Sequence, residues 1–513
     1  MKSRLFIAFL FVAIVCRAQL DRSGTPVSWN QQLTVPIANE WVSEANVALL
    51  LEEDANQIDD RSVAYRFAYA HEVAWDMNNS GSWMNLANGD RLWILGISYD
   101  GAHSISVTMN QLQIPKGGRL YLYSEDHLDY IGPLTEDDNR TDEITLPHVH
   151  GEKVFLEYYE PRSYRGEGSL TVSYVAGAYR DNVEEAVPMQ GCAQWLSDSP
   201  SVLSSSRASS AVMRVLVDHG QRYATAVMIN NTLNNAEPYV ILPTQLLNEN
   251  PASLVFQFGV NSMDCLAQQY ECNMQSICGA EFLCVDSEHS MALVRLSSSP
   301  KSDWDAYFAG WSISANLNES HYCIQHPKGL AKSYSRYEDG FMPLLQAEEQ
   351  LIGLAGSGLG QTYGGSLGSP LLDENGNVLG IFVGGNTRCN NNGGFDRFVM
   401  LSDVWLTFRQ FLDPLQSSAD RIPGMDTPAI ELESAQDHNV LVFPNPALDR
   451  LNLVFSDATP LLSSSIYDAA GRFLQSFGTQ TVLDVSALNE GVYVLKVITG
   501  EGVVSRSVMI TKK

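Results

Sequence analysis

Short segments with period-two patterning recur along most of this 513-residue chain, and they constrain its fold more than any other feature. They are clearest between residues 58 and 180, in RLYLYSED, KVFLEYYEP and SLTVSYVAGAYR. Each alternates apolar and polar residues, is rich in aromatic and β-branched side chains, and is bounded by turn residues. Helical spacing is scarce before residues 401–412 (LSDVWLTFRQFL), where a helix is predicted. The pattern predicts an all-β protein.

The length of the chain predicts about three or four domains rather than one core. Residues between 414 and 439 are rich in Pro, Ser and acidic residues without apolar periodicity, which is typical of a linker. Strand-like segments resume after it and have the size of a small Ig-like β-sandwich. We expect a signal peptide over residues 1–18, an N-terminal β domain over 19–187, a second β domain over 188–415, a linker over 416–438 and a C-terminal domain over 439–513.

The first residues, MKSRLFIAFLFVAIVCRA, have a basic start, an apolar run and a small residue, Ala18, before Gln19. They predict a cleaved export signal, and the apolar run is too short for a membrane span. Removal of the signal deletes three basic residues and takes the formal charge from −27 to −30. Such a chain repels phosphate backbones, so nucleic acid is not an expected partner, and its acidity keeps an exported protein soluble.

Seven of the 8 cysteines remain after removal of the signal. An oxidising compartment favours disulfides, and an odd number leaves one thiol over. A zinc site is an alternative for the cluster of Cys265, Cys272, Cys278, Cys284 and His289. Its spacings lack the short CxxC pairs that structural zinc sites use, so disulfides are preferred. No metal and no cofactor are predicted.

Several motifs of the last 75 or so residues occur together: FPNPALDRLNL at 443–453, IYDAAGR at 466–472, LDVSALNEGVYVLKV at 483–497 and the basic end TKK. In this order they resemble the sorting domain that Bacteroidetes-type bacteria attach to cargo of the type IX secretion system. The resemblance implies handling by that machinery, passage across the outer membrane, and a protein that is secreted or displayed on the cell surface. An ordinary terminal β domain is the alternative.

Motifs spread over residues 191–389 resemble the lysyl endopeptidase group of secreted trypsin-like peptidases. They are GCAQWL, YVILPTQLL, YFAGW, CIQHPKG, GGSLGSPLLDENGNVLG, and GG followed by Cys389. The resemblance implies a chymotrypsin-like double β-barrel with a terminal helix, and it places the N-terminal β domain where the family carries a pro-region. It also implies a disulfide between Cys192 and Cys389, and we expect a second between Cys265 and Cys323.

A serine peptidase needs a hydroxyl nucleophile, an imidazole base and a carboxylate that orients the base. The resemblance aligns these three roles with Leu367, Leu246 and Ser290. Because three separately anchored motifs all differ, we predict loss of catalysis, and no catalytic residue is assigned. The alternative is an active endopeptidase with lysine or arginine preference that uses Ser366 or Ser369 in a relocated triad.

Two features of the family persist. The backbone amides of the GGSLG loop, with Gly365 and Ser366, are a remnant of the oxyanion loop, although a retained turn shape also accounts for them. Asp396 aligns with the acid that reads the substrate lysine, so it is a candidate for a cation-binding pocket. A surface aspartate, or one at a helix N-terminus, is the alternative, and the neighbouring family histidine is Val383 here.

The processing junction also departs from the family, because Met189 and Gln190 precede Gly191 where a lysine is expected. Self-cleavage is therefore not predicted, and the N-terminal domain would stay attached and cover the cleft. We predict an inactive peptidase homologue that binds an unknown peptide or protein. A purely structural surface component is a third possibility.

Overall fold

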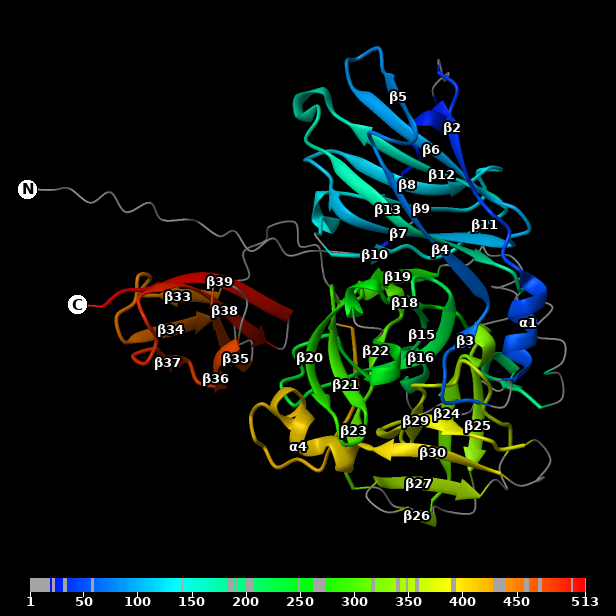
Figure 1. Ribbon diagram of the computed structural model, residues 1–513. Coiled ribbons are helices and arrows are strands. Elements are labelled where there is room, and N and C mark those ends of the chain that lie inside the picture. The colour runs from blue at the N-terminus through cyan, green and yellow to red at the C-terminus, as the bar shows by residue number, and fades with distance from the viewer. Residues whose placement is uncertain are drawn as a thin grey trace, which may run out of the picture. The chain divides into compact units, whose positions relative to one another are not determined.

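The structure is a computed structural model that forms two compact units, residues 16–429 and the C-terminal residues from 430 on. It describes the chain except for residues 1–18, 21–23, 31–34, 57–59, 141, 182–188, 190–191, 199–206, 248–249, 262–273, 315–318, 338–341, 347–348, 356–358, 389–393, 428–439, 456–460, 469–472, 500–501 and 513. Strands dominate, as Figure 1 shows, and the predicted all-β class is confirmed.

Two sheets form the N-terminal part of the larger unit. One has the order β10-β7-β13-β4 with β11 beside β7, and the other has the order β2-β6-β12-β8-β9 with β5 beside β6. Their strands are β4 (Ala68–Asp76), β7 (Ser104–Gln113), β10 (Ile144–Thr145), β11 (Val149–His150), β13 (Ser169–Ala178), and β2 (Ala38–Val42), β5 (Ser82–Asn85), β6 (Arg91–Tyr99), β8 (Arg119–Ser124), β9 (Tyr130–Leu134), β12 (Lys153–Glu160). Their alternating apolar residues pack into one core, which includes Trp93, Ile105 and Leu122.

The second β domain expected from the sequence, residues 188–415, is here called the peptidase-like part. A 9-stranded sheet forms its first half, in the order β1-β19-β18-β15-β16-β17-β21-β20 with β3 beside β16. The strands are β1 (Gln19–Leu20), β3 (Tyr65–Arg66), β15 (Val212–Val217), β16 (Arg222–Ile229), β17 (Tyr239–Pro243), β18 (Val255–Phe258), β19 (Gln275–Cys278), β20 (Ala280–Asp286) and β21 (Met291–Leu296). All its pairings are antiparallel. Because β3 belongs to the N-terminal part of the chain, residues ahead of the peptidase-like part complete its sheet.

A 10-stranded sheet forms the second half, in the order β14-β25-β24-β28-β29-β30-β27-β26, with β23 beside β29 and β31 beside β23. The strands are β14 (Gln194–Trp195), β23 (Trp311–Ser312), β24 (His321–Gln325), β25 (Ser333–Tyr337), β26 (Met342–Gln346), β27 (Glu349–Ala355), β28 (Pro370–Leu372), β29 (Val378–Gly385), β30 (Phe395–Met400) and β31 (Arg421–Ile422). Helix α4 (Leu401–Leu412) follows β30 and buries Leu401, Val404, Phe408 and Leu412, as its apolar spacing predicts.

The predicted linker differs from the structure over its first residues. β31 pairs with β23, and β32 (Met425–Asp426) pairs with β22 (Tyr307–Phe308). These segments therefore belong to the larger unit, because backbone pairing outweighs a Pro- and Ser-rich composition. Residues 428–439 lie outside the described residues.

The N-terminal sheets share a core with the peptidase-like part. Leu216, Tyr223 and Val255 of that part belong to the same apolar cluster as the N-terminal strands. The ring of Phe67 stacks on Tyr223 with centroids 4.0 Å apart, and the carbonyl oxygen of Gly220 accepts a hydrogen bond from a histidine ring nitrogen of the N-terminal part, His148 Nε2, over 2.8 Å. Both parts contribute buried apolar area to one cluster, so their contact is stabilised in the same way as a domain core.

Other helical elements are short. Helix α1 (Val47–Asn56) precedes β3, and the 3-10 helices are η1 (Val27–Asn30), η2 (Glu136–Asp138), η3 (Arg162–Tyr164), η5 (Leu196–Asp198), η6 (Ala208–Ala211), η7 (Thr244–Leu246), η8 (Pro251–Ser253), η9 (Ser302–Trp304) and η10 (Pro327–Gly329). Among the described residues, no helix is long and apolar enough to cross a membrane.

The C-terminal unit consists of two antiparallel sheets, β33-β34-β37 and β36-β35-β38-β39. The strands are β33 (Val440–Phe443), β34 (Arg450–Phe455), β37 (Val482–Asp484), β35 (Leu461–Asp468), β36 (Phe473–Gly478), β38 (Gly491–Thr499) and β39 (Gly502–Ile510). Leu451 and Leu483 of one sheet and Ile466 and Leu495 of the other share one apolar cluster. This two-layer arrangement agrees with the predicted β-sandwich.

Candidate functional site

The loop from Tyr363 to Ser369 is a tight turn between the two sheets of the peptidase-like part. Gly365 and Gly368 adopt φ of +92° and +88°, a left-handed conformation that favours glycine. A methyl group on Gly368 would lie 2.1 Å from the carbonyl oxygen of Thr225 and 3.4 Å from Cδ1 of Leu246. The glycines are therefore required by conformation and by close approach, which accounts for the GGSLG pattern.

Thr225 of β16 holds this loop from the opposite sheet. Its amide donates to the carbonyl oxygen of Leu367 over 2.9 Å, and its hydroxyl donates to that of Gly365 over 2.9 Å. The same hydroxyl accepts from the amide of His326 over 3.0 Å. Backbone contacts across the two sheets thus fix the register of the loop.

Two of the three residues that the family resemblance aligns with a catalytic triad lie together at this loop. Leu246, at the end of η7, and Leu367 are both fully buried and belong to one apolar cluster. Ser290 lies in the turn before β21 with φ of +55°, and its carbonyl oxygen accepts from the amide of Thr244 over 2.9 Å. The two aligned leucines thus share one apolar cluster, and the backbone of Ser290 is bonded to η7, which ends at Leu246.

Two serines flank Leu367, and both are completely buried. The hydroxyl of Ser366 donates to Oε1 of Gln325 and accepts from the amide of Tyr363 over 2.9 Å. Its two partners are thus an amide side chain and the backbone of its own loop. The Ser369 hydroxyl has no hydrogen-bond partner among the described residues.

Two histidines, His289 beside Ser290 in the chain and His326 in the CIQHPKG segment, have other partners. His326 is fully buried, its Nδ1 donates to the carbonyl oxygen of Leu330 over 2.8 Å, and burial holds its pKa well below the usual range. Nδ1 of His289 lies 2.9 Å from Oδ1 of Asp286, whose other carboxyl oxygen accepts from Thr407 of α4 over 2.7 Å. This pair connects the β20–β21 turn to the helix.

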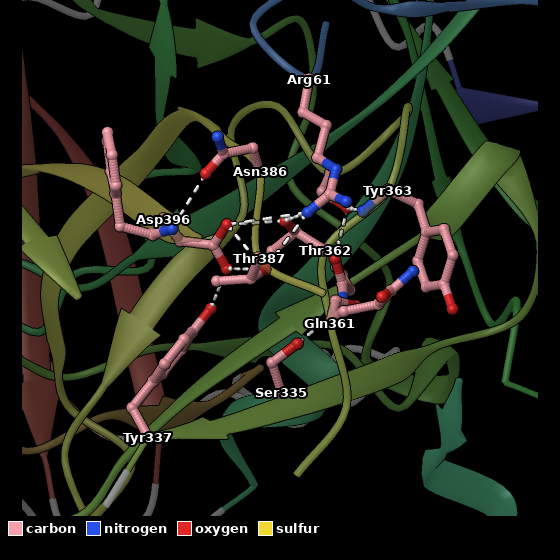
Figure 2. A network of polar contacts seen from close by, with 12 residues as sticks. Arg61, Ser335, Tyr337, Gln361, Thr362, Tyr363, Asn386, Thr387 and Asp396 are labelled. Carbon is pink, nitrogen blue, oxygen red and sulfur yellow. Dashed lines mark hydrogen bonds and ion pairs between the residues drawn. The ribbon is translucent and has the colours of Figure 1, made fainter. Parts of the chain in front are cut away.

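Asp396, in β30, lies at the centre of a polar network (Figure 2). The hydroxyl of Tyr337 donates to Oδ2 over 2.7 Å, and the hydroxyls of Thr362 and Thr387 donate to Oδ1 over 2.9 Å each. The carboxylate is completely buried. The alternative of a surface or helix-terminal aspartate is therefore wrong, because the Asp396 side chain is completely buried and the residue lies near the start of β30, a strand that precedes α4.

Burial raises the pKa of the Asp396 carboxyl, and the hydrogen bond from Tyr337 and the positive charge of Arg61 oppose that rise. Burial and the neighbouring carboxylate hold the pKa of Tyr337 well above its usual range. Removing a carboxylate from water is costly unless donors or a cation replace the lost hydration. Here three hydroxyls and one guanidinium do so.

The guanidinium belongs to Arg61, which the sequence did not single out. Its Nη1 donates to the hydroxyl of Thr362 over 2.8 Å and to that of Thr387 over 3.2 Å, and lies 3.8 Å from Oδ1 of Asp396. Arg61 is itself buried. Nothing in its local sequence distinguishes it from other arginines, and its partner Thr362 is 301 positions away, so no sequence signal could have found it.

The oxyanion-loop remnant is closely packed. A methyl group on Gly365 would lie 2.8 Å from the carbonyl oxygen of His326 and 2.8 Å from the amide nitrogen of Lys328. The amide of Lys328 donates to the carbonyl oxygen of Gly364 over 2.6 Å. Whether the loop retains an anion site stays a prediction.

The cysteine predictions have different outcomes. Cys192 is disulfide-bonded, and its predicted partner Cys389 lies outside the described residues. The predicted Cys265–Cys323 bridge is wrong in this structure, because Cys323 is a free thiol buried against apolar residues of the second sheet. Cys278 and Cys284 are also free thiols, whereas Cys265 and Cys272 lie outside the described residues. In the part of the chain that is described, no group of three or more His, Cys, Asp or Glu residues could hold a metal ion.

The two antiparallel sheets and the loop between them belong to a serine peptidase-like domain. Residues 197–399 match the family model of the lysyl endopeptidase C-terminal domain, and residues 441–511 match that of the secretion system C-terminal sorting domain. The chain therefore carries a lysyl endopeptidase-type domain followed by a type IX sorting domain, and both resemblances are confirmed.

Solved structures that match this chain include three proteases. The inactive form of the Rv3671c protease of M. tuberculosis has 12% identity and a TM-score of 0.28, with 43% of this chain and 97% of that chain covered. Deg5 has 10% identity and a TM-score of 0.29, with 42% and 95% covered. The HtrA-type protease AlgW with a tripeptide has 12% identity and a TM-score of 0.28, with 60% and 95% covered.

The sorting domain indicates that the type IX secretion machinery handles the chain. It also indicates a location outside the cell, as a secreted or surface-attached protein, as the sequence predicts.

Proposed function

We propose that this protein is a catalytically inactive homologue of the lysyl endopeptidases that binds a peptide or protein through the Asp396 pocket. The observation that carries the proposal is the burial of Leu246 and Leu367 in one apolar cluster. Neither side chain has an atom that can attack a carbonyl or accept a proton. Loss of the nucleophile or the base alone removes most of the rate in such triads.

The contacts of Ser366 do not favour it as a replacement nucleophile. The Ser366 hydroxyl is engaged by Gln325 and by the Tyr363 amide. A displaced nucleophile also needs an imidazole within hydrogen-bond reach, and the described contacts of His289 and His326 are with Asp286 and with the Leu330 carbonyl. These partners support the inactive homologue over a relocated triad.

The polar groups around Asp396, here called the Asp396 pocket, support binding. A fully buried carboxylate surrounded by the hydroxyls of Tyr337, Thr362 and Thr387 favours a cationic group. The ligand class expected from this chemistry is a peptide or protein segment with an arginine or lysine side chain. Arginine suits several hydroxyl acceptors because it presents five donors in a fixed plane.

The test of inactivity uses purified full chain and an Arg61→Ala variant, since Arg61 lies in the pocket and would mask a latent activity. Both are incubated with lysine- and arginine-containing peptides and with a serine-directed phosphonate. We expect no turnover and no covalent label in either protein. Label or turnover in the Arg61→Ala variant would establish an active peptidase with a relocated triad.

The test of binding uses immobilised Arg61→Ala protein to capture exported proteins or peptides. The amount captured is compared with that captured by the double variant Arg61→Ala/Asp396→Asn. We expect the second change to abolish capture, because the asparagine keeps the shape of the side chain and removes its charge. Partners that bind both variants equally would indicate a structural surface component that does not use the pocket.

A further inference from the structure

The segment from Asp60 to Arg66 extends across the peptidase-like part from the N-terminal part of the chain. Its last two residues form β3 and pair antiparallel with β16, Tyr65 opposite Tyr223 and Arg66 opposite Arg222 (Figure 1). Ala64 belongs to the same apolar cluster as Leu246 and Leu367. The segment, here called the strap, thus shares an apolar cluster with two of the aligned catalytic positions and, through Arg61, contacts the polar groups around Asp396.

The guanidinium of Arg61 lies beside the Asp396 carboxylate, where a cationic ligand would bind (Figure 2). Each of Thr362 and Thr387 accepts a hydrogen bond from Nη1 and donates one to the carboxylate, so the two hydroxyls relay between guanidinium and acid. The arginine and the aspartate are both buried. Charge, donors and acceptors are therefore matched within the chain itself.

Glycines let the strap lie close to the pocket rim. A methyl group on Gly384 would lie 3.1 Å from Cβ of Ser62, and one on Gly364 would lie 3.1 Å from Cδ2 of Tyr65. Both distances are tighter than ordinary contacts between side chains. A side chain at either position would push the strap outward, so the two glycines allow the strap to lie where it does.

One end of the strap is held by helix α1. Near its start, the amide of Ser62 donates to Oδ1 of Asp60 over 2.9 Å, a contact within the strap itself. At its end, the guanidinium of Arg66 donates to Asp54 over 2.8 Å and to the Leu50 carbonyl oxygen over 3.1 Å, both in α1. Beside the strap lies a cavity of about 490 Å³ lined by Tyr65, Lys328 and Tyr363 among others. The strap is therefore anchored beside a space that other groups can enter.

We infer that the strap is an internal ligand of the Asp396 pocket, and that an external arginine or lysine side chain binds only when Arg61 is displaced. This inference rests on the proposed function, because it assigns the regulation of the same site. The external partner must present a cationic side chain on a segment that competes with the strap. If the strap leaves the pocket about 1% of the time, its removal strengthens the apparent affinity about a hundredfold.

The experiment measures binding of p-aminobenzamidine, a small amidinium probe, by its fluorescence. The proteins are the full chain, Arg61→Ala, Arg61→Ala/Asp396→Asn, and Arg165→Ala as the matched control. Arg165 is exposed and donates to Asn85, away from the pocket. We expect Arg61→Ala to bind at least about tenfold more tightly than the full chain and the control. The Asp396→Asn change should then abolish binding.

Three outcomes overturn part of this account, and they are distinguishable. Equal, Asp396-dependent binding by the full chain and Arg61→Ala would show an open pocket, so the internal ligand fails and the proposed function stands. Tighter binding by Arg61→Ala that survives Asp396→Asn would place the probe elsewhere, so the pocket itself fails. Binding by neither protein would show that displacing Arg61 opens no cation site, and the inference fails.

A second measurement tests the contact without any probe and serves if Arg61→Ala folds poorly. Arg61→Gln, Asp396→Asn and their double variant are unfolded in urea to obtain a double-mutant cycle. We expect the effects of the two single changes on the unfolding equilibrium to be non-additive by at least about tenfold. Additive effects would show that Arg61 does not occupy the pocket in solution.

Discussion

Leu246 and Leu367 lie in an apolar cluster, whereas Asp396 of the same peptidase-like part lies among hydroxyls and a guanidinium. The two leucine side chains are stabilised by packing alone, and neither can donate or accept a proton. A buried carboxylate, by contrast, is stable only when donors and a cation compensate it. The comparison teaches that the two regions differ independently. The buried carboxylate of Asp396 still requires a cation, although the positions aligned with the catalytic nucleophile and base are leucines.

The largest effect is expected from breaking the apolar side of this comparison. Leu367→Asn places an amide in the cluster with no room for water, so the free energy of unfolding should fall by about 3–5 kcal/mol. Urea unfolding measures it. The control is Leu367→Met, which keeps the volume and should cost less than about 1.5 kcal/mol. Equal losses for both variants would contradict a tightly packed, dry cluster.

An intermediate effect is expected from weakening the polar side. Tyr337→Phe removes the hydroxyl that donates to Asp396 over 2.7 Å and should lower the free energy of unfolding by about 1.5–3 kcal/mol. Tyr69→Phe is the control, because Tyr69 is exposed. The loss should appear in urea unfolding at neutral pH and shrink at a pH low enough to protonate Asp396. A loss independent of pH would indicate that the hydroxyl does not serve the carboxylate.

The smallest effect concerns the dependence of stability on pH. The pKa of Asp396 is raised above 3.8 in the folded state. The folded protein then binds a proton more readily than the unfolded chain, so the contribution of Asp396 to stability decreases as pH rises from about 3.8 through the folded pKa. Asp396→Asn should remove this decrease, measured as the difference from wild type across pH, whereas Asp303→Asn at an exposed position should not. An unchanged slope in Asp396→Asn would contradict the raised pKa.

Much of the fold could be predicted from local pattern. Alternation in segments such as KVFLEYYEP predicts strands. The structure has strand β12 (Lys153–Glu160) there, paired with β6 on one side and β8 on the other. The apolar spacing of LSDVWLTFRQFL predicts a helix, and α4 has those bounds. The composition-based linker was less accurate, because β31 and β32 depend on partners from residues 307–312 that composition does not reveal.

For the candidate site, the sequence by itself determined which residue types stand at each position of the loop: glycines at Gly365 and Gly368, a leucine at 367 and an acid at 396. The loop register follows from these, because the left-handed turns require glycine. Only the tertiary structure decided that Leu246 and Leu367 share a cluster and that Arg61 meets Asp396. The physical reason is that local conformation is fixed by neighbours in the chain. Charge pairing and packing between distant residues depend on the topology that brings their strands together.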